Sequence, residues 1–161
     1  KICANTNKNK EIKVKRLRRH TFINKNEICD KIMNRNEIQN KVKQICNELI
    51  YKQGYISSID VLNKLTYLTY DNIKDWRFGK IPYLEKVCNA NLATLSFVNK
   101  TIRQIANDLK LKNSLTVYMK HGKGEKTKLQ FSKTGDDNIE KLYATHYLDT
   151  NRIEELKTIN K

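Results

Sequence analysis

The spacing of apolar residues predicts that most of the chain is helical. Over residues 26–52 they recur three or four positions apart, which is typical of one helical face. Gly54 then offers the left-handed conformation that commonly ends a helix. Ser57 or Ser58 can cap a second helix, and Thr69 can cap a third with the sequence YDNIKDWRF. We therefore expect three helices in succession.

Two further helices are expected between Pro82 and Lys110. Pro82, the chain's only proline, suits the first turn of a short helix PYLEKVC, because it lacks the amide donor that this position leaves unpaired. Asn91 can cap a longer helix with a continuous apolar stripe, formed by Leu92, Leu95, Val98, Ile102, Ile105, Ala106 and Leu109. The opposite face of that helix carries polar and basic side chains: Lys100, Arg103, Gln104, Asn107 and Lys110.

Residues 115–133 change period and predict a β-hairpin. Apolar and polar residues alternate on both sides of HGKGEK, a loop that contains two glycines. Gly135 and Asp136 interrupt the alternation. Helices are expected afterwards at about 138–147 and 150–158.

This order of elements predicts a mainly α fold with one β-hairpin, a winged-helix-like helical domain. We expect a basic N-terminal arm at 1–25 and a single helical domain at 26–161, because a chain of 161 residues fits one core. In a winged helix-turn-helix, one helix enters the DNA major groove and the hairpin lies along the adjacent backbone. Residues 91–110 would be the recognition helix, and the hairpin at about 115–133 would be the wing.

The charge is strongly positive and unevenly spread. The chain holds 32 lysines and arginines against 17 acidic residues, a formal net charge of +15, which attracts polyanions such as nucleic acid. Residues 1–25 hold nine of these basic residues and one acidic residue, so this segment is either a phosphate-binding arm or a solubilising tail. The hairpin adds lysines beside glycines that let backbone amides approach a phosphate. The expected nucleic-acid-binding residues are Lys13, Lys15, Arg16, Arg18, Arg19, Lys100, Arg103, Gln104, Asn107, Lys120, His121, Lys123, Lys126 and Lys128.

Other classes of function lose support because their motifs are missing from the sequence. There is no P-loop, no dinucleotide-binding glycine motif, no HExxH and no G-x-S-x-G. Cys3, Cys29, Cys46 and Cys88 lie far apart, so we expect free thiols in a reducing cytoplasm and no structural metal. We assign no cofactor and no catalytic residue. The sequence shows neither a signal peptide nor an apolar run long enough for a membrane span, so the expected localisation is cytoplasmic.

The stretch WRF allows a functional and a structural interpretation. Trp76 and Phe78 could stack on bases, but aromatic residues at a helix end more often pack in the core. Arg77 between them is expected to cap backbone carbonyls or to pair with Asp75 or Glu85. The structural interpretation is therefore the one we expect here.

The stretch LYATHYL also allows two interpretations. Tyr143, His146 and Tyr147 would share one helical face, which suits a buried aromatic stripe, or a catalytic group in which His146 is the base. A lone histidine is usually structural, so the aromatic stripe is favoured. The nearby acidic residues have the pattern of a helix N-terminal cap and not of a two-metal site: Asp136, Asp137 and Glu140.

From about Gly54 to Leu148 the chain resembles a bacterial family of small proteins. The resemblance lies in DWRFGKIPYLEKV, LTVYMKHGKGEK and LQFSKTGDDNIEKLYATHYL. With that family these stretches share the motifs WRFGxxPYLE and FSKxGxxxIExxYATHY. The resemblance implies a bacterial or phage origin, but it brings no known activity, cofactor or active-site residue. The basic arm and the first helix lie outside it.

Together these observations predict a nucleic-acid-binding protein that is not an enzyme, with DNA expected before RNA. The first alternative is a metal-independent ribonuclease or toxin-like effector that uses His121, His146 and nearby lysines or tyrosines. The second is a phage or accessory protein-interaction module that docks on an acidic partner or a nucleoprotein complex. A monomer and a homodimer formed through the 26–52 helix are both compatible with the sequence, and no membrane partner is expected.

Overall fold

The computed structural model describes residues 33–159. The predicted basic arm at 1–25 lies outside the described residues, as does the first part of the 26–52 helix. The candidate nucleic-acid-binding residues of the arm therefore also lie outside them: Lys13, Lys15, Arg16, Arg18 and Arg19.

The first described helix, α2 (Arg35–Gln53), has well-defined ends at both termini. The Asn34 side chain accepts a hydrogen bond from the Glu37 amide, and the Glu37 carboxylate accepts one from the Asn34 amide, so the two residues form a capping box. Gly54 ends the helix with φ of 75°, as the sequence predicts. Five side chains on one face of α2 are buried: Ile38, Val42, Ile45, Cys46 and Leu49.

Three short helices follow, which are α3 (Ser58–Lys64), α4 (Tyr70–Arg77) and the 3-10 helix η2 (Leu84–Val87). Ser57 caps α3 and Thr69 caps α4, each by accepting a hydrogen bond from a backbone amide in the first turn. The sequence predicts the cap at Thr69, and of the two serines that it offers for α3, Ser57 is the cap. Pro82 does not lie in the first turn of η2, because the cap of that helix is Tyr83.

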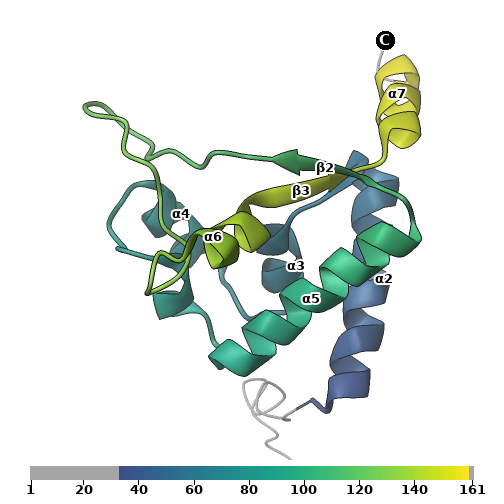
Figure 1. Cartoon of the computed structure of the whole chain (residues 1–161). Coiled ribbons are helices and arrows are strands. Elements are labelled where there is room, and N and C mark those ends of the chain that lie inside the picture. The colour runs from purple at the N-terminus through teal and green to yellow at the C-terminus, as the bar shows by residue number, and fades with distance from the viewer. Residues whose placement is uncertain (1–32, 160–161) are drawn as a thin grey trace, which may run out of the picture. The chain divides into compact units, whose positions relative to one another are not determined.

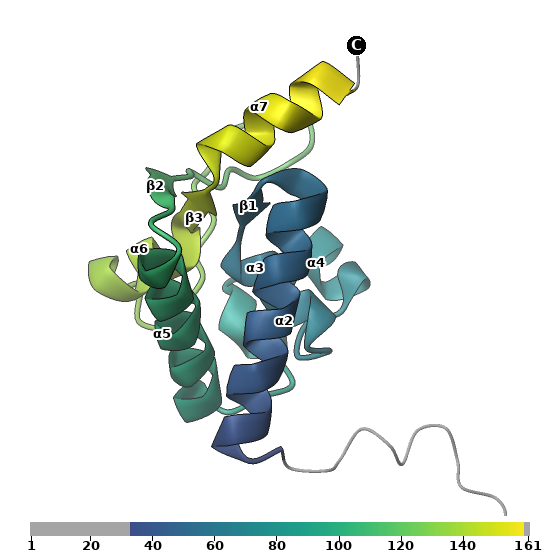
Figure 2. The ribbon, with the colours of Figure 1, turned by 90° about the vertical axis from the view of Figure 1, so that its right-hand side faces the viewer.

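The next helix, α5 (Leu92–Asp108), begins at its cap Asn91 and packs against α2 (Figures 1 and 2). The central part of the predicted apolar stripe is buried, whereas Leu92 and Leu109 at its two ends are exposed. The predicted recognition face points to solvent, since each of its side chains is exposed: Lys100, Arg103, Gln104 and Asn107.

A small antiparallel sheet contains three strands, β1 (Tyr55–Ile56), β2 (Lys112–Leu115) and β3 (Thr145–Leu148). Their order is β1-β3-β2, so the last strand in sequence lies at the centre. In the register of the sheet, Asn113 faces Tyr147 and Tyr55 faces Leu148. The fold is therefore mainly helical, as expected, with a sheet that joins three distant parts of the chain (Figure 1).

The predicted hairpin at 115–133 differs from the observed arrangement. Its two arms pair only near the tip, where the Leu129 amide donates to the Tyr118 carbonyl at 2.8 Å and the Lys120 amide donates to the Thr127 carbonyl at 2.9 Å. The strand that enters the hairpin, β2, pairs instead with β3, which follows much later in the chain. Alternation of apolar and polar residues indicates an extended segment but does not identify its partner strand. The pairing of β2 with β3 could therefore not be predicted from this pattern.

The helix predicted at 138–147 is also wrong in its second half. The helix α6 (Asp137–Ala144) ends where β3 begins, so His146 and Tyr147 lie on a strand and point to opposite faces of the sheet. The short stretch LYATHYL fits both periods, and pairing with β2 decides between them. The last described helix is α7 (Thr150–Ile159).

An aromatic cluster forms the core beneath the hairpin. Trp76 is fully buried, and its ring lies 5.1 Å from the ring of Phe131 and 5.7 Å from that of Tyr118. Phe131 in turn stacks on Tyr143 at 5.4 Å. Aromatic pairs at these separations add stability beyond the area they bury. The sequence stretches around Trp76, Tyr118 and Phe131 thus meet in one core.

Candidate nucleic-acid interface

The tip of the hairpin, residues 120–128, carries positive charge that no carboxylate neutralises. It holds four lysines, Lys120, Lys123, Lys126 and Lys128, and one acidic residue, Glu125. Residues 33–159 form three ion pairs, Lys64–Glu48, Lys80–Asp75 and Arg152–Glu155, and none of them involves the tip. Of the four, only Lys126 uses its ammonium group in hydrogen bonds among the described residues, to the carbonyls of Lys120 and Gly122. The other three lysine ammonium groups are available to an anion.

The root of the hairpin is fixed by hydrogen bonds to α4 and η2. The indole N–H of Trp76 donates to the Gln130 carbonyl at 2.8 Å, and the amide of Leu84 donates to the same oxygen at 3.2 Å. The Glu85 amide donates to the Phe131 carbonyl at 2.9 Å. Backbone groups of the returning arm are therefore satisfied by residues that lie much earlier in the chain, and the tip projects from a fixed base.

Glu140 completes the root, and its role differs from the one that the sequence suggests. Asp136 is the true cap of α6, since its carboxylate accepts from the amides of Asn138 and Ile139. Glu140 is buried instead, and its carboxylate accepts the Phe131 amide, the Ser132 amide and the Ser132 hydroxyl. These donors compensate the carboxylate for the water it gives up on burial, and they occupy its oxygens. The Glu140 carboxylate therefore holds the returning arm of the hairpin against α6 by hydrogen bonds and does not act as a metal ligand.

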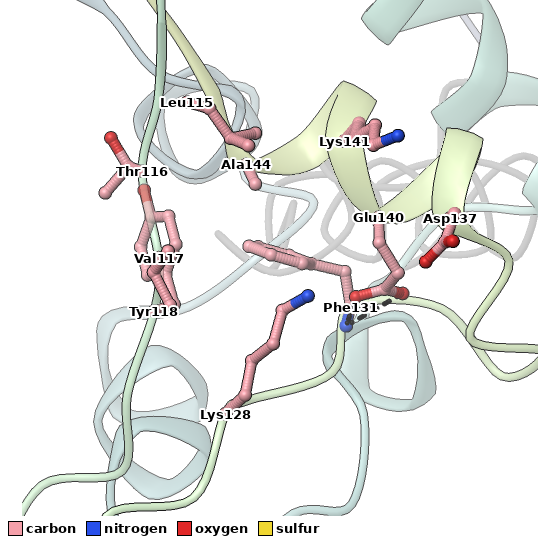
Figure 3. Close-up of a pocket in the computed structure, with 10 residues that line it drawn as sticks. All are labelled: Leu115, Thr116, Val117, Tyr118, Lys128, Phe131, Asp137, Glu140, Lys141 and Ala144. Carbon is pink, nitrogen blue, oxygen red and sulfur yellow. Dashed lines mark hydrogen bonds between the residues drawn. The ribbon is translucent and has the colours of Figure 1, made fainter.

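A small pocket lies between the hairpin and α6 (Figure 3). Its lining includes the exposed side chains of Leu115 and Val117, and Lys128 reaches across it from the returning arm. The pocket measures about 80 Å³, well below the roughly 300 to 1,000 Å³ of small-molecule sites. Because Glu140 on its wall is already saturated with hydrogen bonds, that residue does not offer the pocket a free catalytic carboxylate.

The C-terminal end of α4 meets the hairpin and forms what we call the α4–hairpin patch: Arg77, Phe78, Lys120 and His121. The His121 amide donates to the Arg77 carbonyl at 2.7 Å, and the rings of Phe78 and His121 meet edge to face at 6.0 Å. Gly79 permits this approach, because it has φ of 72° and a Cβ there would clash with the Lys120 side chain at 2.8 Å. The close approach of α4 and the hairpin in this patch therefore uses Gly79.

Two of the three expectations for WRF are wrong. Trp76 is in the core, as expected, but Phe78 is exposed over 42% of its surface. Among the described residues, the Arg77 side chain neither donates to a backbone carbonyl nor pairs with Asp75 or Glu85. Its guanidinium lies 4.4 Å from the centre of the Tyr118 ring and 5.7 Å from that of Trp76. A cation over a ring face is attracted by the ring quadrupole while its N–H groups stay free for another acceptor.

His146 lies in a different group of aromatic side chains from the one expected. Its Nε2 is 2.6 Å from the Tyr118 hydroxyl, and its ring stacks on Tyr55 at 5.4 Å. Tyr143 points elsewhere, since its hydroxyl donates to Glu85. Burial lowers the pKa of His146, with Asp60 raising it and Arg77 lowering it to a smaller extent.

Burial has the opposite effect on the phenol: it raises the pKa of Tyr118 to about 12. The Tyr118 hydroxyl therefore stays protonated and can donate to a neutral imidazole.

The two histidines of the ribonuclease hypothesis are not brought together by any contact among the described residues. His121 contacts Phe78, whereas His146 contacts Tyr118 and Tyr55. The geometry thus assembles a hydrogen-bonded pair and not a two-histidine site.

The recognition face of α5 and the α4–hairpin patch lie on different helices that are separated by the middle of the domain. Figure 2 shows α4 and α5 on opposite sides of α2 and α3. A shallow pocket of about 240 Å³ runs between α5 and α2, and Gln104 and Lys43 contribute to its lining. The predicted α5 contacts and the predicted hairpin contacts are therefore two surfaces.

The described cysteines are not reactive sites. Burial raises the pKa of Cys46 to about 12, and burial together with the Glu85 charge raises the pKa of Cys88 to about 12 as well. Both thiols therefore stay protonated at neutral pH. Within residues 33–159, no group of three histidine, cysteine or acidic side chains is placed to hold a metal ion. No helix in this part of the chain has the length and apolar character that a bilayer crossing requires.

Comparison of the chain with models of known protein families, with curated proteins and with solved structures found no match. The function is therefore inferred from the geometry and charge of the molecule.

Proposed function

We propose that this protein binds nucleic acid, and that the hairpin tip contacts its phosphates. The observation that carries the proposal is the set of lysine ammonium groups at the tip that form no ion pair: Lys120, Lys123 and Lys128. Phosphate contacts of this kind release counterions and supply most of the sequence-independent affinity of nucleic-acid-binding proteins. The tip glycines, Gly122 and Gly124, leave the backbone open to a phosphate.

A winged-helix-like DNA-binding protein is the more specific form of this proposal. In its favour, the exposed face of α5 presents Arg103, Gln104 and Asn107, whose side chains can pair with base edges in a major groove. The element order also fits, since a helix with a free polar face is followed by a strand and a hairpin. One feature departs from the motif: α4 and η2 intervene between α3 and α5 in place of a tight turn.

A fluorescence-anisotropy titration of a labelled DNA duplex tests the proposal. The triple variant with Lys120, Lys123 and Lys128 changed to glutamine is compared with the wild type, and Lys126 is kept because it closes the tip. We expect the triple variant to bind at least roughly tenfold more weakly, since each ammonium group removed takes away a favourable counterion term.

The matched control removes the same charge elsewhere. Lys41, Lys86 and Lys157 are exposed, form no ion pair and lie on α2, η2 and α7. Their triple glutamine variant should retain nearly all of the wild-type affinity. Equal reductions of affinity in both triple variants would show that net charge alone drives binding, and absence of wild-type binding at low salt would remove the proposal. Replacing Arg103 or Asn107 by alanine then reports whether α5 contributes.

A further inference from the structure

We infer that the α4–hairpin patch binds unpaired nucleotides, with Phe78 as the ring on which a base stacks. This inference depends on the proposed function and narrows it, because it names the form of nucleic acid that the hairpin side of the molecule takes. The patch combines an exposed aromatic ring with cationic groups that form no ion pair among the described residues. That combination is the one by which proteins hold single-stranded nucleic acid.

Phe78 is placed for stacking. It follows the fully buried Trp76 by two positions at the end of α4, yet 42% of its own surface is exposed. At the tip it meets the His121 ring edge to face, and an added Cβ on Gly122 would lie 3.9 Å from the ring. Because Gly122 has no side chain, nothing at that position covers the ring.

The backbone that carries the ring is fixed by hydrogen bonds before any ligand arrives. The Phe78 amide donates to the Lys74 carbonyl at 3.0 Å, and the Gly79 amide donates to the Trp76 carbonyl at 2.9 Å. On the other side, the His121 amide is bonded to the Arg77 carbonyl. Because this backbone is already fixed, binding has to order only the side-chain torsions of Phe78, which favours affinity.

The residues on either side of Phe78 in the chain, Arg77 and Gly79, are in contact with or carry cationic side chains of the patch. The Arg77 side chain makes no hydrogen bond and no ion pair among the described residues, and its guanidinium is held over the Tyr118 ring. The stem of Lys120 crosses Gly79, the residue that directly follows Phe78 in the chain. A strand whose base stacks on Phe78 would bring its phosphates to these two side chains.

The site favours unpaired over paired nucleotides for a geometric reason. Inside a duplex the faces of each base are covered by its neighbours, so an aromatic side chain can reach only their edges. In a single strand the faces are free, and stacking on an aromatic side chain contributes roughly 1 to 3 kcal/mol per base. Since the patch lies on α4 and not on α5, it can engage a single-stranded tail independently of the α5 face (Figure 2).

The test compares a blunt DNA duplex with the same duplex carrying a single-stranded tail, each titrated with the full-length protein. For the wild type, the tail should raise the affinity by about 5- to 150-fold, which corresponds to the stacking free energy of one base. Phe78→Ala and Phe78→Leu should abolish this gain, which is measured for each variant as the ratio of its affinities for the tailed and the blunt DNA. Phe78→Tyr should retain it, because it keeps the ring.

Tyr70→Ala is the matched control, since Tyr70 is an exposed aromatic residue, 75% accessible, at the opposite end of α4. It should keep the full gain from the tail. Equal wild-type affinity for the two DNAs, or a gain that survives in Phe78→Leu, would overturn the inference and leave the proposed function standing. Failure of the wild type to bind either DNA would overturn both.

Discussion

The root and the tip of the hairpin differ in almost every physical respect, although they are continuous in sequence. At the root, buried side chains and backbone groups have their hydrogen bonds satisfied by Trp76, Glu85 and Glu140. At the tip, three lysines have no acidic partner and the glycines leave the backbone open. The root therefore maintains the fold, whereas the tip is free to contact another molecule.

Residues that look alike in sequence also divide between the root and the exposed surface at or beside the tip. Trp76 and Phe78 are neighbouring aromatic residues, yet one fixes the root and the other lies in the α4–hairpin patch. Likewise, Glu125 at the tip is exposed, whereas Glu140 at the root accepts hydrogen bonds from three groups of Phe131 and Ser132. We therefore expect variants of the root to change stability and variants of the tip to change binding.

Among the root variants, Glu140→Ala should destabilise the protein most. The substitution leaves the amides of Phe131 and Ser132 buried without an acceptor, which should lower the free energy of unfolding by about 3 kcal/mol. Urea denaturation measures the change, with Lys141→Ala as an exposed control on the same helix. A decrease below about 0.5 kcal/mol would show that the root does not depend on this carboxylate.

Trp76→Phe should rank next, with a decrease in the free energy of unfolding of about 2 kcal/mol. It removes the indole hydrogen bond to the Gln130 carbonyl and leaves space among packed rings, while the Leu84 amide still occupies that oxygen. The measurement is again urea denaturation, with Tyr70→Phe as the control. Should Trp76→Phe be as stable as the wild type, the aromatic cluster would not be what fixes the root.

A smaller change in stability should follow from pH. Because burial holds the pKa of His146 below the usual value of about 6.5, the unfolded chain binds more protons than the folded protein in this range. Stability is therefore full above about pH 6.5 and declines as the pH falls toward the lowered pKa. We expect stability to decline less in His146→Gln than in the wild type between neutral and mildly acidic pH. Identical declines in thermal unfolding would contradict this assignment.

The tip variant should affect stability least. Changing Lys120, Lys123 and Lys128 to glutamine should alter the free energy of unfolding by less than about 0.5 kcal/mol, because these ammonium groups form no ion pairs. Urea denaturation of the triple variant checks this. A large decrease would mean that the tip lysines have a structural role, and the distinction between root and tip would fail.

Local features of the fold can be predicted from the sequence. The caps at Ser57, Thr69 and Asn91 and the glycine stop at Gly54 depend on residues a few positions apart, and the structure confirms each of them. The exposed polar face of α5 follows from the same short-range periodicity.

Long-range pairing cannot be predicted in this way. The residues of β3 fit a helical period, and their partner β2 lies in a distant part of the sequence. The role of Glu140 depends on donors that come from another element, and the exposure of Phe78 depends on how the hairpin meets α4. The α4–hairpin patch exists only once these elements have packed.

Whether the tip binds phosphates is decided by the salt dependence of nucleic-acid binding, measured for the wild type and for the variant with Lys120, Lys123 and Lys128 changed to glutamine. A plot of log K against log salt concentration should be steep for the wild type. For the variant the slope should be smaller by roughly 0.7 to 0.9 for each phosphate that is no longer neutralised, or about 2 to 3 in all. Parallel plots for the two proteins, or a flat plot for the wild type, would contradict binding of phosphates by the tip.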